Sequence, residues 1–210
     1  MASLSRLSPL ARWFVALGVT AVLVALATLF VDKPVADFAR EHHYYLYRSS
    51  HRAMHALALL IPATMAGVIV AGLWAAAGRP VPRWAEALTL AGLSAGLGVV
   101  TCELLLKPVF GRAPPNTYFE DGTYGFFPFS GDSNYQGFPS GHTVFITAFM
   151  GVLWIYYPKG RVLYVLAIAA LMAALVATDN HYLSDTVGGL FTGATASWLT
   201  VTLRNRMGRT

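Results

Sequence analysis

The stretch that decides the fold is residues 13–31, which read WFVALGVTAVLVALATLFV and contain no charged side chain. A helix that crosses the hydrocarbon core of a bilayer needs about 20 mostly apolar residues, so this run is long enough to span a membrane. It is too long for the apolar core of a signal peptide, and no cleavage site of small residues follows it before Asp32. We therefore expect a retained transmembrane helix.

The composition of the whole chain agrees with a membrane protein. Of its 210 residues, 56% are hydrophobic and only 12% are charged, whereas soluble domains carry about 25% charged residues. The mean hydropathy is +0.53. These values exclude a disordered chain, a nucleic-acid-binding arm and an ordinary cytosolic enzyme. The single cysteine, Cys102, excludes an intrachain disulfide and a cysteine-based metal site.

Five further apolar segments follow the first one. They are residues 53–77, 85–106, 142–157, 162–178 and 186–203. The segments 142–157 and 186–203 are short for free-standing spans, so we expect their ends to lie against other protein or at the membrane interface. The sequence predicts an all-α, polytopic membrane protein with six transmembrane helices that form a single domain over residues 1–210.

Loop charges predict the orientation of these helices, because cytoplasmic loops are enriched in Lys and Arg. Six spans place both termini on one side. With that side in the cytoplasm, nine of the fifteen basic residues lie inside, namely Arg6, Arg12, Arg79, Arg83, Lys159, Arg161, Arg204, Arg206 and Arg209. We therefore expect both termini in the cytoplasm. The net charge of +5 is then explained by orientation and by contact with anionic lipids, with no nucleic-acid partner.

Two of the outer segments are longer than the other loops. Residues 32–52 are polar with interleaved aromatics, and we expect a helix that lies at the membrane surface. Residues 107–141 form a connection of a length that is usually functional or disordered, and its aromatic side chains favour order. We interpret its carboxylates Glu120, Asp121 and Asp132 as solvated or structural and not as metal ligands.

Polar groups at the ends of membrane helices are candidates for function, because hydrocarbon penalises them. Lys107 and Arg112 lie at the outer end of the third span, where an ammonium and a planar guanidinium suit phosphate oxygens. Ser140, Gly141 and His142 lie where the fourth span begins, and the free N–H groups of a helix N-terminus bind anions. Taken singly, these clusters are also explained by snorkelling cations and by an ordinary helix cap.

A third cluster lies between the fifth and sixth spans. Asp185 follows His181 by four residues, so its carboxylate can fix one imidazole nitrogen and leave the other free to attack. By itself this spacing also fits a simple surface pair. The topology places all three clusters on the outer side of the membrane.

Together the clusters read Lys-x4-Arg, Pro-Ser-Gly-His and His-x3-Asp. This combination resembles the type 2 phosphatidic acid phosphatase superfamily, whose pattern is Lys-x6-Arg-Pro, Pro-Ser-Gly-His and Ser-Arg-x5-His-x3-Asp. The motifs cover residues 107–185, and the six-span layout extends the resemblance over the whole chain. The resemblance implies a membrane lipid phosphatase.

The resemblance also implies a role for each site residue. His181 would attack phosphorus and form a phosphohistidine, Asp185 would orient His181, and His142 would protonate the leaving group and then activate water. The phosphoryl oxygens would be bound by Lys107, Arg112, Ser140 and Gly141. Fixed cations can supply the charge of a metal ion, so no metal and no cofactor is expected.

The chain departs from the family pattern at two places. Pro114 stands where the first motif has its Arg, and Ala174 and Leu175 stand where the third motif has Ser-Arg. Arg112 is then the guanidinium that remains in the first motif. The other arginines available on the outer side are Arg40, Arg48 and Arg52. One of these three could supply the missing charge, although we interpret them as interfacial, as we do His42, His43, His51 and His55. Asp179 and Asn180 precede His181 and could brace the site.

The predicted function is metal-independent hydrolysis of a phosphomonoester or pyrophosphate on a membrane lipid, at the outer face of the membrane. The expected location is a bacterial inner membrane, with the active site on the periplasmic side. The candidate lipids are phosphatidylglycerol phosphate, phosphatidic acid, undecaprenyl pyrophosphate and lipid A. Two alternatives stay open, a lipid phosphotransferase with the same site and a catalytically inactive protein that binds or transports a lipid phosphate. The sequence leaves the oligomeric state open.

Overall fold

The computed structural model describes residues 7–42, 60–78 and 81–207. These residues are mostly helical and contain no strand, and a single isolated β-bridge pairs Arg112 with Phe126. The α-helices are α1 (Pro9–Leu26), α3 (Leu60–Ala76), α4 (Arg83–Thr101), α5 (Lys107–Phe110), α6 (Pro115–Asp121), α7 (Gly141–Tyr156), α8 (Arg161–Ala177) and α9 (Leu183–Met207). Two π-helical turns, η2 (Ala27–Val31) and η3 (Cys102–Leu106), and one 3-10 turn, η4 (Pro158–Gly160), connect to them.

The first helix is longer than the apolar run that predicts it. Its start is fixed by Ser8, whose Oγ accepts a hydrogen bond of 3.1 Å from the Ala11 N–H, and by Pro9 at the first helical position. The helix then continues through η2 and is described as far as His42. Residues 32–42 are therefore helical, as an extension of α1, and a position at the membrane surface stays a prediction. Residues 43–52 lie outside the described residues.

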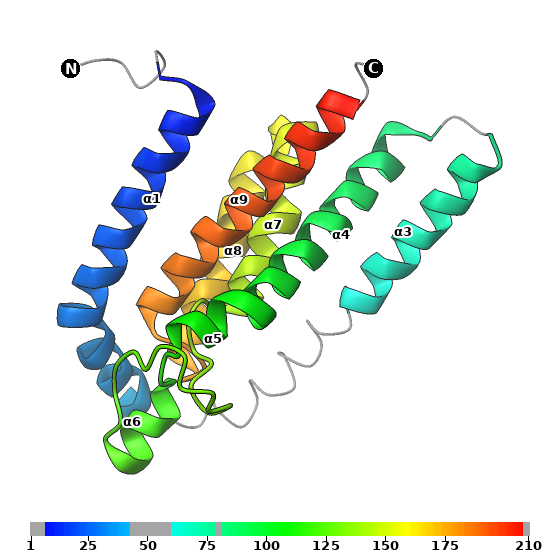
Figure 1. The fold of residues 1–210 in the computed structure, drawn as a ribbon. Helices are drawn as coiled ribbons and strands as arrows, with labels where there is room; N and C mark the ends of the chain where they lie inside the picture. The colour runs from blue at the N-terminus through cyan, green and yellow to red at the C-terminus, as the bar shows by residue number, and fades with distance from the viewer. Residues whose placement is uncertain (1–6, 43–59, 79–80, 208–210) are drawn as a thin grey trace.

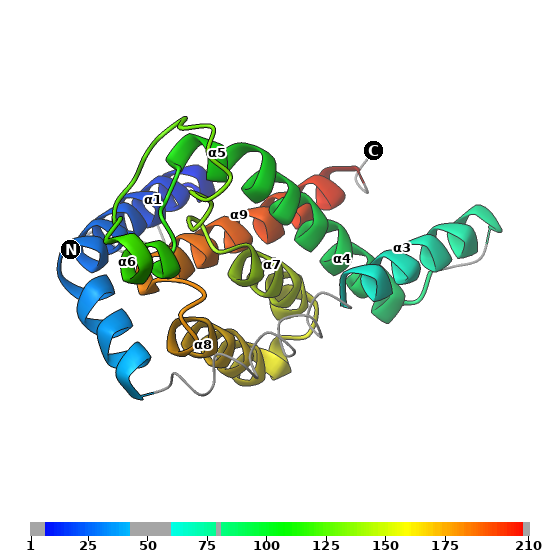
Figure 2. The same ribbon diagram turned by 90° about the horizontal axis from the view of Figure 1, so that it is seen from below.

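The centre of the bundle consists of α4, α7 and α9, which lie side by side in both views (Figures 1 and 2). Small residues let these helices approach closely, as is usual in membrane proteins. A Cβ on Gly193 would come within 2.6 Å of the carbonyl oxygen of Val144, and one on Gly151 would come within 2.4 Å of the Ser197 hydroxyl. The close packing fixes the positions of the N-termini of α7 and α9.

Within the described residues, three helices are long and apolar enough to cross a membrane, namely Pro9–His42, Arg83–Phe110 and Pro158–Ala177. α7 is a shorter apolar helix. The expected spans overlap the helices observed, although residues 53–59 of the second one lie outside the described residues. The all-helical class is confirmed within the described ranges. Six crossings and cytoplasmic termini stay predictions.

The two ends of the bundle differ in what they carry. α1 begins and α9 ends at one end of the bundle, and α5, α6 and the loop that follows them lie at the other end (Figure 1). α7 and α9 both begin at that second end. The three sequence clusters are thus brought together at one end of the molecule.

Candidate active site

Two π-helical turns end directly at residues of the site. Asp32 follows η2, and Lys107 follows η3. A π-turn holds an extra residue, so it changes the direction in which the following side chains point, and such turns are frequent at functional sites. The Lys107 ammonium lies 2.7 Å and 2.9 Å from the two carboxylate oxygens of Glu103, one helical turn earlier.

The N-terminus of α7 is built around Ser140, which is fully buried. Its Oγ accepts hydrogen bonds from the backbone N–H and the hydroxyl of Thr143, at 3.4 Å and 3.2 Å. Its own N–H donates to the carbonyl of Asp185 at 3.0 Å, and this bond joins the start of α7 to the start of α9. The N–H groups of Gly141 and His142 are left without an acceptor in the helix, which makes this end suitable for an anion.

Gly141 connects this helix end to the cluster on the third span. A Cβ at this position would lie 2.6 Å from Glu103 Oε1 and 4.0 Å from Lys107 Nζ. The ammonium of Lys107 therefore lies close to the N-terminus of α7. The structure brings together three of the four residues predicted to bind phosphate, namely Lys107, Ser140 and Gly141.

The two histidines and the aspartate also come together. His181 Nδ1 lies 3.6 Å from Asp185 Oδ2, a distance longer than a hydrogen bond, so Nε2 is the ring nitrogen turned away from Asp185. Asp185 Oδ2 also accepts a hydrogen bond of 2.9 Å from the Tyr182 N–H. The ring centroids of His142 and His181 are 6.4 Å apart. The structure therefore places the two histidines next to each other, as expected for residues of one site.

Arg112 is fully buried, and its contacts are with other protein groups. Its Nη2 donates to Asp32 Oδ2 at 2.9 Å, and its Nε lies 3.9 Å from Asp185 Oδ1. The guanidinium carbon lies 4.5 Å from the ring centroids of both Tyr124 and Phe126 and 4.9 Å from that of Tyr182. The phosphate-binding role predicted for Arg112 stays a prediction, and its contacts favour an indirect role.

Sequence reasoning did not identify Asp32 as a residue of the site. The side chain is 1% exposed, and it accepts hydrogen bonds from Arg112 and from both the N–H and the hydroxyl of Ser184. The sequence signal for Asp32 is weak, since Asp32 is simply the first charged residue after a long apolar run. Its partners Arg112 and Ser184 lie 80 and 152 positions away, too far for a local sequence pattern to predict these contacts.

The cation Arg40 lies beside the loop that carries His181. Arg40 Nη1 is 3.3 Å from Asp179 Oδ2, so Arg40 is part of an ion pair and not only an interfacial residue. Burial raises the pKa of Asp179, and the hydrogen bond and charge of Arg40 oppose that rise. Asn180 donates to Thr178 Oγ1 at 2.6 Å, so it braces the loop locally. Arg48 and Arg52 lie outside the described residues, as do His43, His51 and His55.

The long outer loop is packed by its aromatic side chains, as its composition predicts. Tyr124 donates a hydrogen bond to the Thr28 carbonyl at 2.5 Å, and its ring lies edge-on to Tyr182 at 5.3 Å. Asp121 and Asp132 accept hydrogen bonds from the N–H groups two residues later, within exposed turns. In the parts of the chain that the structure describes, no group of three His, Cys, Asp or Glu side chains is arranged to hold a metal ion.

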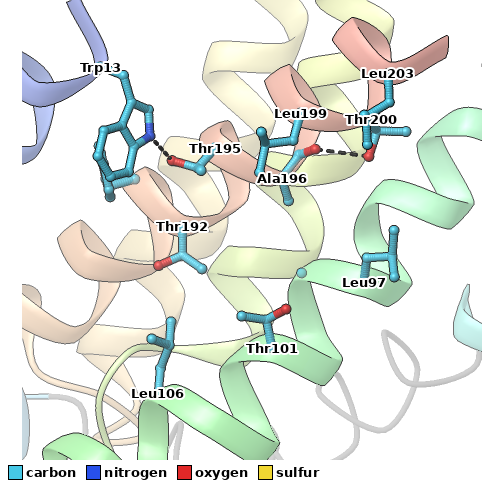
Figure 3. A pocket seen from close by; sticks show the side chains of 12 residues that line it. Trp13, Leu97, Thr101, Leu106, Thr192, Thr195, Ala196, Leu199, Thr200 and Leu203 are labelled. Carbon is cyan, nitrogen blue, oxygen red and sulfur yellow. Dashed lines mark hydrogen bonds between the residues drawn. The ribbon is translucent and has the colours of Figure 1, made fainter. Parts of the chain in front are cut away.

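Two apolar pockets lie between α1 and the rest of the bundle. The first has a volume of about 430 Å³, and Figure 3 shows Trp13 at its edge, where its indole N–H donates to Thr195 Oγ1 at 3.0 Å. The second, of about 400 Å³, is lined by Phe138 and Pro139, which directly precede Ser140. Both pockets share Leu106, Phe191 and Thr192. Apolar space therefore lies directly behind the loop that positions the N-terminus of α7.

Comparison with known proteins gives one family and two relatives. The model of the PAP2 superfamily matches residues 87–209. Lipid A 1-phosphatase of Rhizobium johnstonii is 38% identical over 104 residues, which cover 50% of this chain and 43% of that protein. Lipid A 1-phosphatase of Rhizobium etli is 36% identical over 104 residues, which cover 50% of this chain and 45% of that protein. The match thus spans less than half the length of these curated relatives. No solved structure gave a significant match.

Proposed function

The chain belongs to the PAP2 superfamily, and from that premise we propose that it is a lipid phosphate phosphatase that acts without a metal ion. The observation that carries the proposal is the arrangement of His142, His181 and Asp185. The ring centroids of the two imidazoles are 6.4 Å apart with their planes at 66°, and Asp185 lies on the Nδ1 side of His181. A nucleophile whose orientation is fixed and an opposing acid are the parts that phosphoryl transfer through a covalent intermediate needs.

In the first half of the reaction, His181 Nε2 attacks phosphorus and the bond from phosphorus to the leaving oxygen breaks. His142 gives its proton to that oxygen, so the dephosphorylated lipid leaves as an alcohol. In the second half, His142 takes a proton from water, and the hydroxide formed attacks the phosphohistidine and releases inorganic phosphate. The carboxylate of Asp185 stabilises the cationic state of His181 in both halves.

The phosphoryl oxygens lie at the N-terminus of α7 in this proposal. The first N–H groups of the helix, those of Gly141 and His142, have no acceptor within the helix, Ser140 caps its first turn, and the Lys107 ammonium lies beside it. Fixed dipoles and cations of this kind stabilise the charge that develops on phosphorus oxygens in the transition state. Because Glu103 contacts Lys107, the incoming phosphate competes with a carboxylate for the ammonium.

Two observations support a lipid as the substrate. The pocket lined by Phe138 and Pro139 offers apolar space beside the phosphate site, and three helices among the described residues are suited to a bilayer. Among the candidate lipids, the names of the two relatives favour the phosphate of lipid A. We place the site on the outer face of a bacterial inner membrane, on the basis of the loop charges.

A panel of phosphorylated lipids tests this function. The protein purified in detergent is incubated with lipid A, phosphatidic acid, phosphatidylglycerol phosphate and undecaprenyl pyrophosphate, and both free phosphate and the lipid product are measured. We expect equal amounts of phosphate and dephosphorylated lipid from at least one member, with lipid A the favoured one. Phosphate that moves to an acceptor lipid would indicate a transferase, and no turnover of any member would contradict the proposal.

A further inference from the structure

Asp32 is a buried carboxylate that lies outside residues 87–209, the part of the chain that matches the family. Its Oδ1 accepts a hydrogen bond of 3.0 Å from the Ser184 N–H. Its Oδ2 accepts from the Ser184 hydroxyl and, at 2.9 Å, from Arg112 Nη2. One side chain on the first helix therefore joins the loop after α5 to the first turn of α9, directly beside Asp185.

The guanidinium of Arg112 lies close to two carboxylates. Its Nη2 is in contact with Asp32, and its Nε lies 3.9 Å from Asp185 Oδ1. Asp185 Oδ1 has no hydrogen-bond partner among the described residues, whereas Oδ2 accepts a hydrogen bond from the Tyr182 N–H and lies 3.6 Å from His181 Nδ1. The guanidinium thus stands next to a carboxylate that it does not bind closely.

The surroundings of Arg112 offer no other strong acceptor. Aromatic rings of Tyr124, Phe126 and Tyr182 surround the guanidinium, and in the described structure its Nε and Nη1 make no hydrogen bond. A buried charge is costly unless an opposite charge or a hydrogen bond compensates it. If Asp32 lost its charge, the nearest carboxylate for Arg112 would be Asp185.

We propose that Asp32 is a positioning residue of the reaction: it holds Arg112 so that the Asp185 carboxylate stays available to His181. This inference rests on the proposed phosphatase function. Asp32 and Arg112 neutralise each other through a short charged hydrogen bond. The negative charge of Asp185 is then left to stabilise the cationic form of His181. In this inference Arg112 is held by Asp32 close to Asp185 and makes no contact with the phosphate.

The substitution Asp32→Asn removes the charge and keeps the size and one oxygen that Ser184 can still bind. With Asp32 neutral, Arg112 turns toward Asp185 and competes with His181. We expect kcat to fall about 10- to 100-fold, the usual cost of losing a residue that orients a reacting group. We expect KM to change less than kcat, because the groups that bind the phosphate are untouched.

A second substitution separates this role from a purely structural one. In Asp32→Asn with Arg112→Met, the charge that competes for Asp185 is gone as well, and a buried ion pair replaced on both sides is often tolerated. We expect the double variant to recover kcat relative to Asp32→Asn alone. A double variant that is slower than Asp32→Asn, with weaker binding of vanadate, would show that Arg112 binds the phosphate directly and would overturn the inference.

Ser184→Ala is the matched control. It removes one hydrogen bond to Asp32 and leaves both charges in place, so we expect kcat within about threefold of the wild type, in keeping with the small net value of one hydrogen bond. Folding of each variant is checked by size-exclusion chromatography and thermal unfolding in detergent. If Asp32→Asn does not fold, the double variant decides: kcat within about tenfold of the wild type supports the inference, and a larger loss overturns it.

The activity of the wild type on the lipid panel distinguishes a failure of this inference from a failure of the proposed function. An inactive wild type on every lipid of the panel contradicts the function itself. An active wild type together with a folded Asp32→Asn variant of unchanged kcat contradicts only the role of Asp32.

Discussion

The guanidinium of Arg40 lies 3.3 Å from the carboxylate of Asp179, although the two residues are 139 positions apart in the chain. Asp179 has a φ of 54° and lies two residues before His181. Residues other than glycine rarely adopt this left-handed backbone, so the loop needs support from its surroundings. The ion pair supplies part of that support, and it ties the extension of the first helix to the segment that presents His181.

Charge-preserving substitutions at two arginines test which guanidinium the site depends on. The planar guanidinium of Arg112 donates to Asp32 and lies against three aromatic rings. The lysine in Arg112→Lys cannot reproduce that geometry. We expect kcat/KM to fall strongly. Arg40→Lys keeps a cation that can still reach Asp179 at a half-buried position, so we expect a much smaller change. Both losses are measured by steady-state kinetics on folded protein. A larger loss of kcat/KM in Arg40→Lys than in Arg112→Lys would assign the larger role to Arg40.

Alanine variants of the two histidines are expected to be blocked at different steps of the reaction. His181→Ala removes the nucleophile, so neither turnover nor a phosphorylated enzyme should be detected. His142→Ala removes the acid and base, and we expect kcat to fall by at least about 100-fold. Rapid quenching of each variant with a labelled lipid, followed by detection of acid-labile phosphoprotein, measures both effects. Near-normal turnover in either variant would refute its assigned role.

Gly141→Ala tests the close approach of the third span to the N-terminus of α7. A Cβ at Gly141 would lie 2.6 Å from Glu103 Oε1, so Glu103 must move, and its partner Lys107 with it. We expect a rise in KM and a loss of vanadate affinity.

Gly96→Ala is the control, because a Cβ there meets no atom within 4 Å. Alanine is favoured over glycine in a helix by about 1 kcal/mol, so Gly96→Ala should fold at least as stably as the wild type and keep its activity. Equal kinetics for the two variants would speak against the phosphate site.

The metal-free mechanism predicts how the enzyme responds to chelators and to vanadate. Chelation with EDTA should leave kcat unchanged, since Lys107 and the N–H groups of α7 supply the charge stabilisation. Vanadate should inhibit in competition with the lipid, because it mimics five-coordinate phosphorus. Activity that is lost in EDTA and restored by Mg²⁺ or Zn²⁺ would show that a metal site exists.

Labelling of single cysteines tests the predicted topology. Cys102 is first replaced by Ser, whose hydroxyl can donate to the Pro139 carbonyl that the thiol contacts at 3.3 Å. Cysteines are then introduced singly, as Ser130→Cys in the long loop and as Lys159→Cys in η4. An impermeant thiol reagent on intact cells should label the protein with Ser130→Cys and not the one with Lys159→Cys. The opposite pattern would invert the orientation.

The sequence by itself determined the class of the fold and identified most residues of the candidate site. An uncharged run such as residues 13–31 has few stable conformations other than a helix in lipid, since every backbone polar group must be paired inside the segment. The spacing of His181 and Asp185 is one helical turn, so their proximity is a local property. The family predicted from the three motifs is confirmed by the match over residues 87–209.

Only the tertiary structure decided how the charged groups are paired. Asp32 binds Arg112 and Ser184, and Arg40 binds Asp179, across 80 to 152 positions of chain. The π-turns η2 and η3 set the directions of Asp32 and Lys107, and no residue pattern marks such a turn. The physical reason is that a buried charge is stabilised by whichever partner the packing of the helices brings close. That partner is fixed by the approach of α1, α7 and α9, and not by distance along the sequence.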